Sequence, residues 1–181
     1  MIRLLAAVSM GLGLLVGGPA WAACTFTVTK KAVGPISAAM PFDLEALKIR
    51  MPDCEVRDGR DASEGEISDV ITVHTGEIHL LTLWPDGLGG IFSVFVESPT
   101  VRNKLGPKPG RSFAEIKRRF GIGECDPGLE DFAGTVICAD KKAGNVVYIF
   151  TGRWNGPDGA LPPRSVLRKW RLNRVVWTPP Q

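Results

Sequence analysis

The stretch FDLEALKIRMPDC at residues 42–54 and the stretch FAEIKRRFGIGEC at residues 113–125 have equal length, begin with phenylalanine and end with cysteine. Each carries apolar residues at helical spacing. Gly-Pro pairs at 34–35 and 106–107 precede the two stretches. Self-similarity at one period, here about 71 residues, indicates a duplicated supersecondary unit. We therefore expect a fold built from two copies of one unit.

Within each unit the patterns predict a strand, a turn, a helix and then antiparallel strands. Alternation over residues 25–29 and an apolar, aromatic run over 90–96 predict the opening strands. Pro41 suits the first position of one helix, and Ser112 with Glu115 forms a capping box for the other. The sequence predicts an α+β fold, a sheet packed on helices, with repeats at residues 23–89 and 90–181.

Further elements follow from the same patterns. Hairpins are predicted over residues 70–84 and 135–150, a short helix over 164–170 and a closing strand over 173–177. Residues 57–68 are charged, contain glycine and show no periodicity, so they are predicted to be a loop.

The amino terminus has the pattern of a secretory signal. Arg3 precedes an apolar run at residues 4–18, and Ala20 and Ala22 are small residues at the two positions that a signal peptidase reads. The run is shorter than the roughly 20 residues that a membrane span requires. We expect residues 1–22 to be a signal peptide and the protein to be periplasmic.

Four cysteines remain after that cleavage, an even set that suits disulfides in an oxidising compartment. Cys125 with Cys138 is the favoured pair, because a turn and a short strand bring the chain back, and Cys24 then pairs with Cys54. The alternative is a lipid anchor on Cys24. That alternative requires an aliphatic residue where the chain has Trp21, and it would leave one cysteine unpaired.

Charge is unevenly distributed along the chain. Residues 24–88 carry six Lys/Arg and eleven Asp/Glu, whereas residues 89–181 carry fifteen and eight. A separation of charge between the two parts of the chain can steer a charged partner toward the protein. The alternative is that the acidic and basic parts face each other or are merely solvated. One basic cluster is interleaved with Leu167, Trp170 and Trp177 and would suit an anionic membrane surface; the alternative is that its arginines only project from a core. The cluster comprises Arg164, Arg168, Lys169, Arg171 and Arg174.

Motifs that would identify a reaction are missing. His74 and His79 flank Glu77, but no fourth metal ligand can be named, so we expect no metal site. The chain has no G-x-S-x-G, and the glycines of residues 87–90 open no helix, so we expect no catalytic set and no nucleotide cofactor. A nucleic-acid partner is not expected either.

Several segments carry a resemblance to a known family: residues 33–36, 41–42, 150–159, 161–163 and 176–177. The chain resembles the envelope-stress (sigma-E) regulated lipoprotein family of Gram-negative bacteria, a domain of unknown function. The resemblance implies an envelope location and a duplicated α+β fold, and it brings no catalytic residues with it. Trp21 departs from the pattern at the position that lipid anchoring depends on.

Together these features predict a monomeric, non-catalytic envelope binding protein, linked to envelope maintenance. Its partner would be an envelope protein or a small ligand, bound in a groove between the units where Trp84 and Trp154 could be exposed; the alternative is that both tryptophans are core. A hydrolase of an envelope polymer, using carboxylates of residues 53–66 and Asp158, is a second possibility, and a protein inhibitor is a third.

Overall fold

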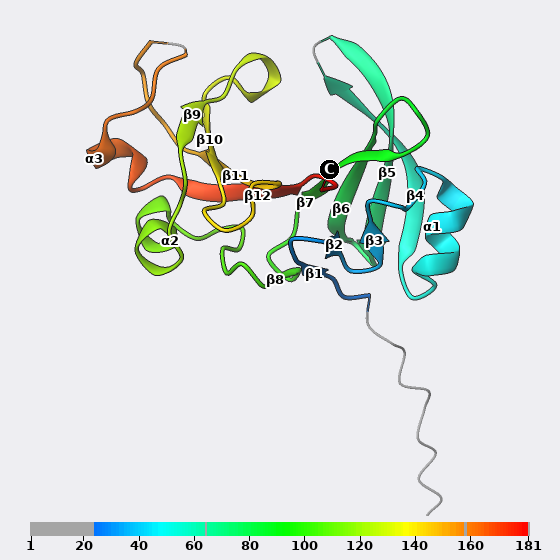
Figure 1. Cartoon of the computed structure of the whole chain (residues 1–181). Helices are drawn as coiled ribbons and strands as arrows, with labels where there is room; N and C mark the ends of the chain where they lie inside the picture. Colours follow the sequence, from blue (N-terminus) through cyan, green and yellow to red (C-terminus); the bar gives the residue numbers. More distant parts are fainter. Residues whose placement is uncertain (1–23, 64, 158, 181) are drawn as a thin grey trace, which may run out of the picture.

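The computed structural model describes residues 24–63, 65–157 and 159–180. Within these residues the chain is mostly β, with an eight-stranded antiparallel sheet, a small mixed sheet and three short α-helices (Figure 1). In sheet order the strands of the large sheet are β4 Glu55–Ser63, β5 Glu66–Thr75, β6 Ile78–Pro85, β7 Ile91–Val96, β12 Arg171–Trp177, β11 Val146–Thr151, β10 Thr135–Ala139 and β9 Cys125–Pro127.

The small sheet joins segments that are far apart in sequence. Its order is β3 Ile36–Ser37, β2 Ala32–Val33, β1 Thr27–Val28 and β8 Arg102–Asn103. β1 pairs with β8 in parallel, with Thr27 opposite Arg102, whereas the other pairs are antiparallel. The turn after β2 needs glycine, because Gly34 has a φ of 58° and a Cβ there would lie 2.6 Å from Cδ1 of Phe26.

Two of the helices begin at side-chain caps. α1 (Leu44–Arg50) follows Asp43, whose Oδ1 accepts from the Ala46 N–H at 2.7 Å. α2 (Phe113–Arg119) follows Ser112, whose Oγ accepts from the Glu115 N–H at 3.3 Å. α3 (Arg164–Leu167) and the 3₁₀ turn η1 (Glu130–Phe132) have no side-chain cap.

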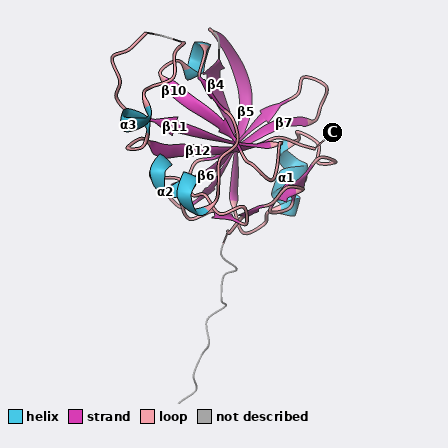
Figure 2. Ribbon diagram, turned by 60° about the vertical axis from the view of Figure 1, so that its left-hand side comes forward, coloured by secondary structure: helices cyan, strands magenta, loops and turns pink. Residues whose placement is uncertain are grey.

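One face of the large sheet forms the core. Buried side chains at alternating positions on the strands belong to a single cluster with residues of the small sheet, α1 and α2. Trp177, Tyr148 and Phe150 are among the largest fully buried side chains. Figure 1 shows the small sheet below the middle of the large sheet, with α1 at one end and α2 at the other. Figure 2 shows the strong twist of the large sheet, whose strands fan out.

The segment predicted as a loop is the largest difference from the sequence analysis. Residues 57–63 continue β4 and residues 66–68 begin β5, in an unbroken antiparallel register from Glu55 opposite His74 to Ser63 opposite Glu66. The segment is charged because β4 is an edge strand with mostly exposed side chains, and charged side chains are common on edge strands. The apolar signal on which strand prediction depends is therefore weak there.

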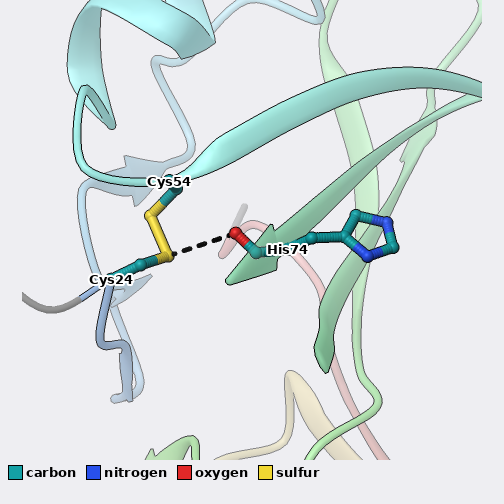
Figure 3. Close-up of a disulfide and its surroundings, with 3 residues drawn as sticks. All are labelled: Cys24, Cys54 and His74. Carbon is teal, nitrogen blue, oxygen red and sulfur yellow. Dashed lines mark hydrogen bonds between the residues drawn. A yellow bond between two sulfur atoms is a disulfide. The ribbon is translucent and has the colours of Figure 1, made fainter. Parts of the chain in front are cut away.

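Two disulfides are present, and they have the pairing that the sequence favours. Cys24–Cys54 ties the segment before β1 to the start of β4 (Figure 3). Its Cys24 sulfur lies 3.7 Å from the carbonyl oxygen of His74, a contact rather than a donated bond because a disulfide sulfur carries no proton. Cys125–Cys138 joins directly opposed residues of β9 and β10.

Candidate functional site: an aromatic groove on the open face of the sheet

A groove lies on the face of the large sheet opposite the core. It has a volume of about 450 Å³, within the range of small-molecule sites. Its floor is formed by residues of β6, β7, β10, β11 and β12. Its walls are formed by Asp61 and Ala62 near the end of β4 and by the turn η1. The lining residues are Asp61, Ala62, Trp84, Phe92, Ser93, Phe95, Asp131, Phe132, Ile137, Val147, Ile149, Arg174, Val176 and Thr178.

Three aromatic rings form a row in this groove. The ring centroids of Trp84 and Phe95 are 6.1 Å apart, and those of Phe95 and Phe132 are 6.3 Å apart, both pairs tilted. Phe95 is the middle ring and lies on β7, next to the junction with β12. Aromatic rings offer large apolar surfaces with few rotatable bonds, so a row of them suits an apolar ligand.

A polar network occupies the floor beside the rings. Arg174 lies 5.7 Å from the Phe95 ring, and its Nε is 3.0 Å from Oε2 of Glu97. Oε1 of Glu97 accepts from the hydroxyl of Thr82 at 3.3 Å, and that hydroxyl is 3.0 Å from Nε2 of His79. Nε2 of His79 also lies 3.0 Å from the carbonyl of Leu81, which can only accept, so Nε2 carries the proton.

This network fixes the position of Arg174. Because Glu97 holds the guanidinium from one side and Phe95 from another, Arg174 remains only partly exposed. A fixed, partly exposed cation beside apolar rings can meet a polar group of a ligand without losing much rotamer entropy. One further donor is buried near the groove: Nε1 of Trp84 has no hydrogen-bond partner among the described residues.

The structure separates the two tryptophans that the sequence analysis grouped. Trp84 lines the groove, whereas Trp154 lines a different, small pocket with Gly156, Pro162 and Trp170. The Trp154 ring packs over its own loop, where a Cβ on Gly156 would lie 2.0 Å from the indole. Trp154 therefore stabilises the loop before α3 and takes no part in the groove.

The basic cluster also divides between locations. Arg174 lines the groove, and Arg171 donates from NH1 to the carbonyl of Gly110 at 2.8 Å, which joins β12 to the segment before α2. Arg164, Arg168 and Lys169 are exposed on and after α3. Of the five residues, Arg174 alone lines the groove, whereas the other four are exposed near α2 and α3.

The two histidines are directly opposed on β5 and β6 and stack with ring centroids 4.7 Å apart. Partial burial lowers the pKa of His74, and the nearby His79 and Arg57 lower it further, against a smaller opposite effect of Glu55 and Glu77. In the described part of the chain, no three His, Cys, Asp or Glu side chains are grouped closely enough to hold a metal ion.

Sequence reasoning missed the middle of the groove. Phe95 and Phe132 were not named as site residues. A signal existed for Phe95, because both the odd-numbered and the even-numbered positions of β7 and of β11 include apolar residues. Alternate residues of a strand point to opposite faces of the sheet, so such a strand has an apolar face besides the one in the core. Of the carboxylates proposed for a hydrolase, Glu64 and Asp158 lie outside the described residues. The others lie just before β4, along β4 and at the start of β5, and among them only Asp61 lines the groove: Asp53, Glu55, Asp58, Asp61 and Glu66.

The fold and the groove define a disulfide-bonded, mainly β protein with an open apolar groove, and the disulfides indicate an extracytoplasmic protein. Among the described residues, no helix is long and apolar enough to span a membrane. The chain belongs to the family described as "Protein of unknown function (DUF1131)", which matches residues 17–179.

Two comparisons give a homologue from Escherichia coli. The chain is 23% identical over 158 residues to the "Uncharacterized protein YfeY" of strain K12, covering 87% of this chain and 82% of that protein. The crystal structure of the uncharacterized protein yfeY from Escherichia coli superposes with a TM-score of 0.68 at 22% identity, covering 85% of this chain and 99% of that chain. This likeness supports the fold.

Proposed function

We propose that the protein is a non-catalytic, monomeric binding protein of the periplasm that holds the apolar part of a small amphipathic ligand in the groove. The row of Trp84, Phe95 and Phe132 carries this proposal. Apolar surface that is exposed to water in the free protein and covered on binding contributes about 25 cal/mol per Å². Arg174, held in place by Glu97, would meet the ligand's polar group.

The two disulfides support the periplasm as the compartment of the protein. Structural disulfides persist in oxidising compartments, and both bonds join elements that the fold brings together. The signal peptide predicted at residues 1–22 lies outside the described residues. A lipid anchor on Cys24 would need the sulfur that Cys54 now holds, so we favour the unanchored form. The envelope-stress link, with a role in envelope maintenance, rests on the family resemblance.

We further propose that the two halves arose by duplication. The order helix, then four antiparallel strands, occurs as α1-β4-β5-β6-β7 and again, with η1 and α3 inserted between strands, as α2-β9-β10-β11-β12. The large sheet has corresponding strand orders on the two sides of the β7–β12 pair. On this proposal β7 closes the first unit, so the boundary falls after residue 96 and not before residue 90. The groove then lies across the junction of the two units.

A fluorescent apolar probe, N-phenyl-1-naphthylamine, tests the groove. We expect the purified protein to bind the probe with a rise in its fluorescence, and Phe95→Ala to weaken binding about tenfold or more, since tenfold corresponds to about 1.4 kcal/mol. Leu88→Ala is the matched control, because Leu88 is 94% exposed and does not line the groove. Far-UV circular dichroism shows whether both variants remain folded.

Native mass spectrometry of the untagged protein from its own cells tests the same proposal with natural ligands. We expect a population that carries a bound amphiphile, lost in Phe95→Ala. A chain that is always bare and also fails to bind the probe would refute the proposal. A diacylglycerol mass on Cys24 would instead overturn the unanchored form.

A further inference from the structure

Hydrogen bonds between main-chain groups hold α2 against the segment around α3. The N–H of Phe113 donates to the carbonyl of Trp170 at 2.8 Å, and the N–H of Ala114 donates to the carbonyl of Arg168 at 3.2 Å. Figures 1 and 2 both show α2 and α3 at the same end of the large sheet. Residues 113–119 and 164–170, separate in sequence, therefore contribute to one surface.

This surface, the basic face, is formed by five exposed side chains from the two elements. They are Lys117, Arg118, Arg164, Arg168 and Lys169. The carboxylate within α2, that of Glu115, is already engaged: its Oε1 lies 3.1 Å from NH1 of Arg111 and 3.6 Å from NH1 of Arg119. Residues 160–177 contain no Asp or Glu at all. The basic face therefore keeps its positive charge.

The arrangement of these five cations determines which kind of anionic partner the basic face can bind. They stand along the exposed sides of two elements and do not converge on a cavity: none of the five lines the groove or the small pocket beside Trp154. Spread cations match an array of anionic groups better than a single phosphate. Leu161, before α3, is 43% exposed and adds an apolar side chain at the same end of the molecule.

We propose that the basic face docks on the surface of an anionic phospholipid bilayer. Charge complementarity carries the docking, because each Lys or Arg close to an anionic membrane strengthens binding roughly fivefold. Exposed charges of this kind are screened by salt, so the attachment is reversible. The proposal does not depend on a ligand in the groove, and it requires no lipid on Cys24.

Co-sedimentation with vesicles tests the basic face. We expect the full mature protein to bind vesicles of phosphatidylglycerol and phosphatidylcholine in equal parts at low salt, to bind vesicles of phosphatidylcholine alone much more weakly, and to lose binding at high salt. The double variant Arg118→Gln/Arg168→Gln should lower the partition coefficient about 25-fold, at roughly fivefold per cation.

A matched variant separates this surface from net charge. Lys30→Gln/Lys31→Gln also removes two exposed cations, but from the turn between β1 and β2, and should change the partition coefficient by less than about threefold. Equal losses in the two double variants would overturn the basic face. Binding to a soluble polyanion such as polyphosphate without binding to the anionic vesicles would overturn the membrane as its partner.

Discussion

Tyr148 and Asp140 form a buried polar pair in the core of the second half. The Tyr148 hydroxyl donates to Oδ2 of Asp140 at 2.5 Å, and Oδ1 accepts from the N–H groups of Lys142 and Ala143 at 2.7 and 2.8 Å. Burial raises the pKa of the Tyr148 hydroxyl, and the hydrogen bond to the Asp140 carboxylate raises it further. The pair thus fixes the turn between β10 and β11.

Replacing Tyr148 with phenylalanine should destabilise the protein by about 2 kcal/mol, because a buried carboxylate oxygen loses its donor. Urea unfolding at neutral pH measures this loss. The stability that the Tyr148–Asp140 hydrogen bond contributes depends on pH. Near pH 10 the tyrosine of the unfolded chain loses its proton, whereas the folded one keeps it, so this stability is present below about pH 10 and is lost as pH rises above it.

Absorbance at 295 nm gives an independent readout, since Tyr148 is the only tyrosine in the chain. The native protein should show no tyrosinate until it unfolds at high pH, whereas the protein in concentrated urea should titrate near pH 10. A native titration curve that matches the one in urea would contradict the buried pair.

Single elements show where sequence reasoning works and where it stops. The α2 start and the β10–β11 hairpin were predicted because a cap residue and short apolar runs carry local signals. β2 and β3 pair with their sequence neighbours but are only two residues long, too short for an alternating pattern to be recognised. β8 is equally short and forms through its pairing with the distant β1. In the groove, Trp84 was named as a candidate but Phe132 was not, because the position of the Phe132 ring depends on where the fold places η1.

The contribution of the Ser112 cap to the stability of α2 can be tested by a single substitution. Ser112→Ala removes the oxygen that accepts from the Glu115 N–H, and a lost cap costs about 1 kcal/mol. Ser165→Ala, at an exposed position within α3, is the control and should change stability by less than about 0.5 kcal/mol. Urea unfolding compares the two variants. Equal free energies of unfolding would show that tertiary contacts alone position α2.

Residues 24–96, the first half, and the residues that follow them, the second half, are linked through both sheets of the molecule. β7 pairs with β12, with Val96 opposite Val175, and β1 pairs with β8. In addition, the carbonyl of Lys30 in the first half accepts from Nδ2 of Asn145 at 2.9 Å and from Nε1 of Trp177 at 3.3 Å in the second. Since these links and the shared core cluster cross the junction, neither half can bury its apolar face alone.

We therefore expect the whole chain to unfold in one cooperative step. In urea, tryptophan fluorescence and far-UV circular dichroism should give coincident transitions with one midpoint. A fragment ending after β7, residues 24–98, should show no cooperative transition, because its half of the β7–β12 pair and its strand β1 lack their partners. Two separate transitions, or a fragment that folds cooperatively, would mean that each unit is a domain in its own right and that the groove lies at a movable junction.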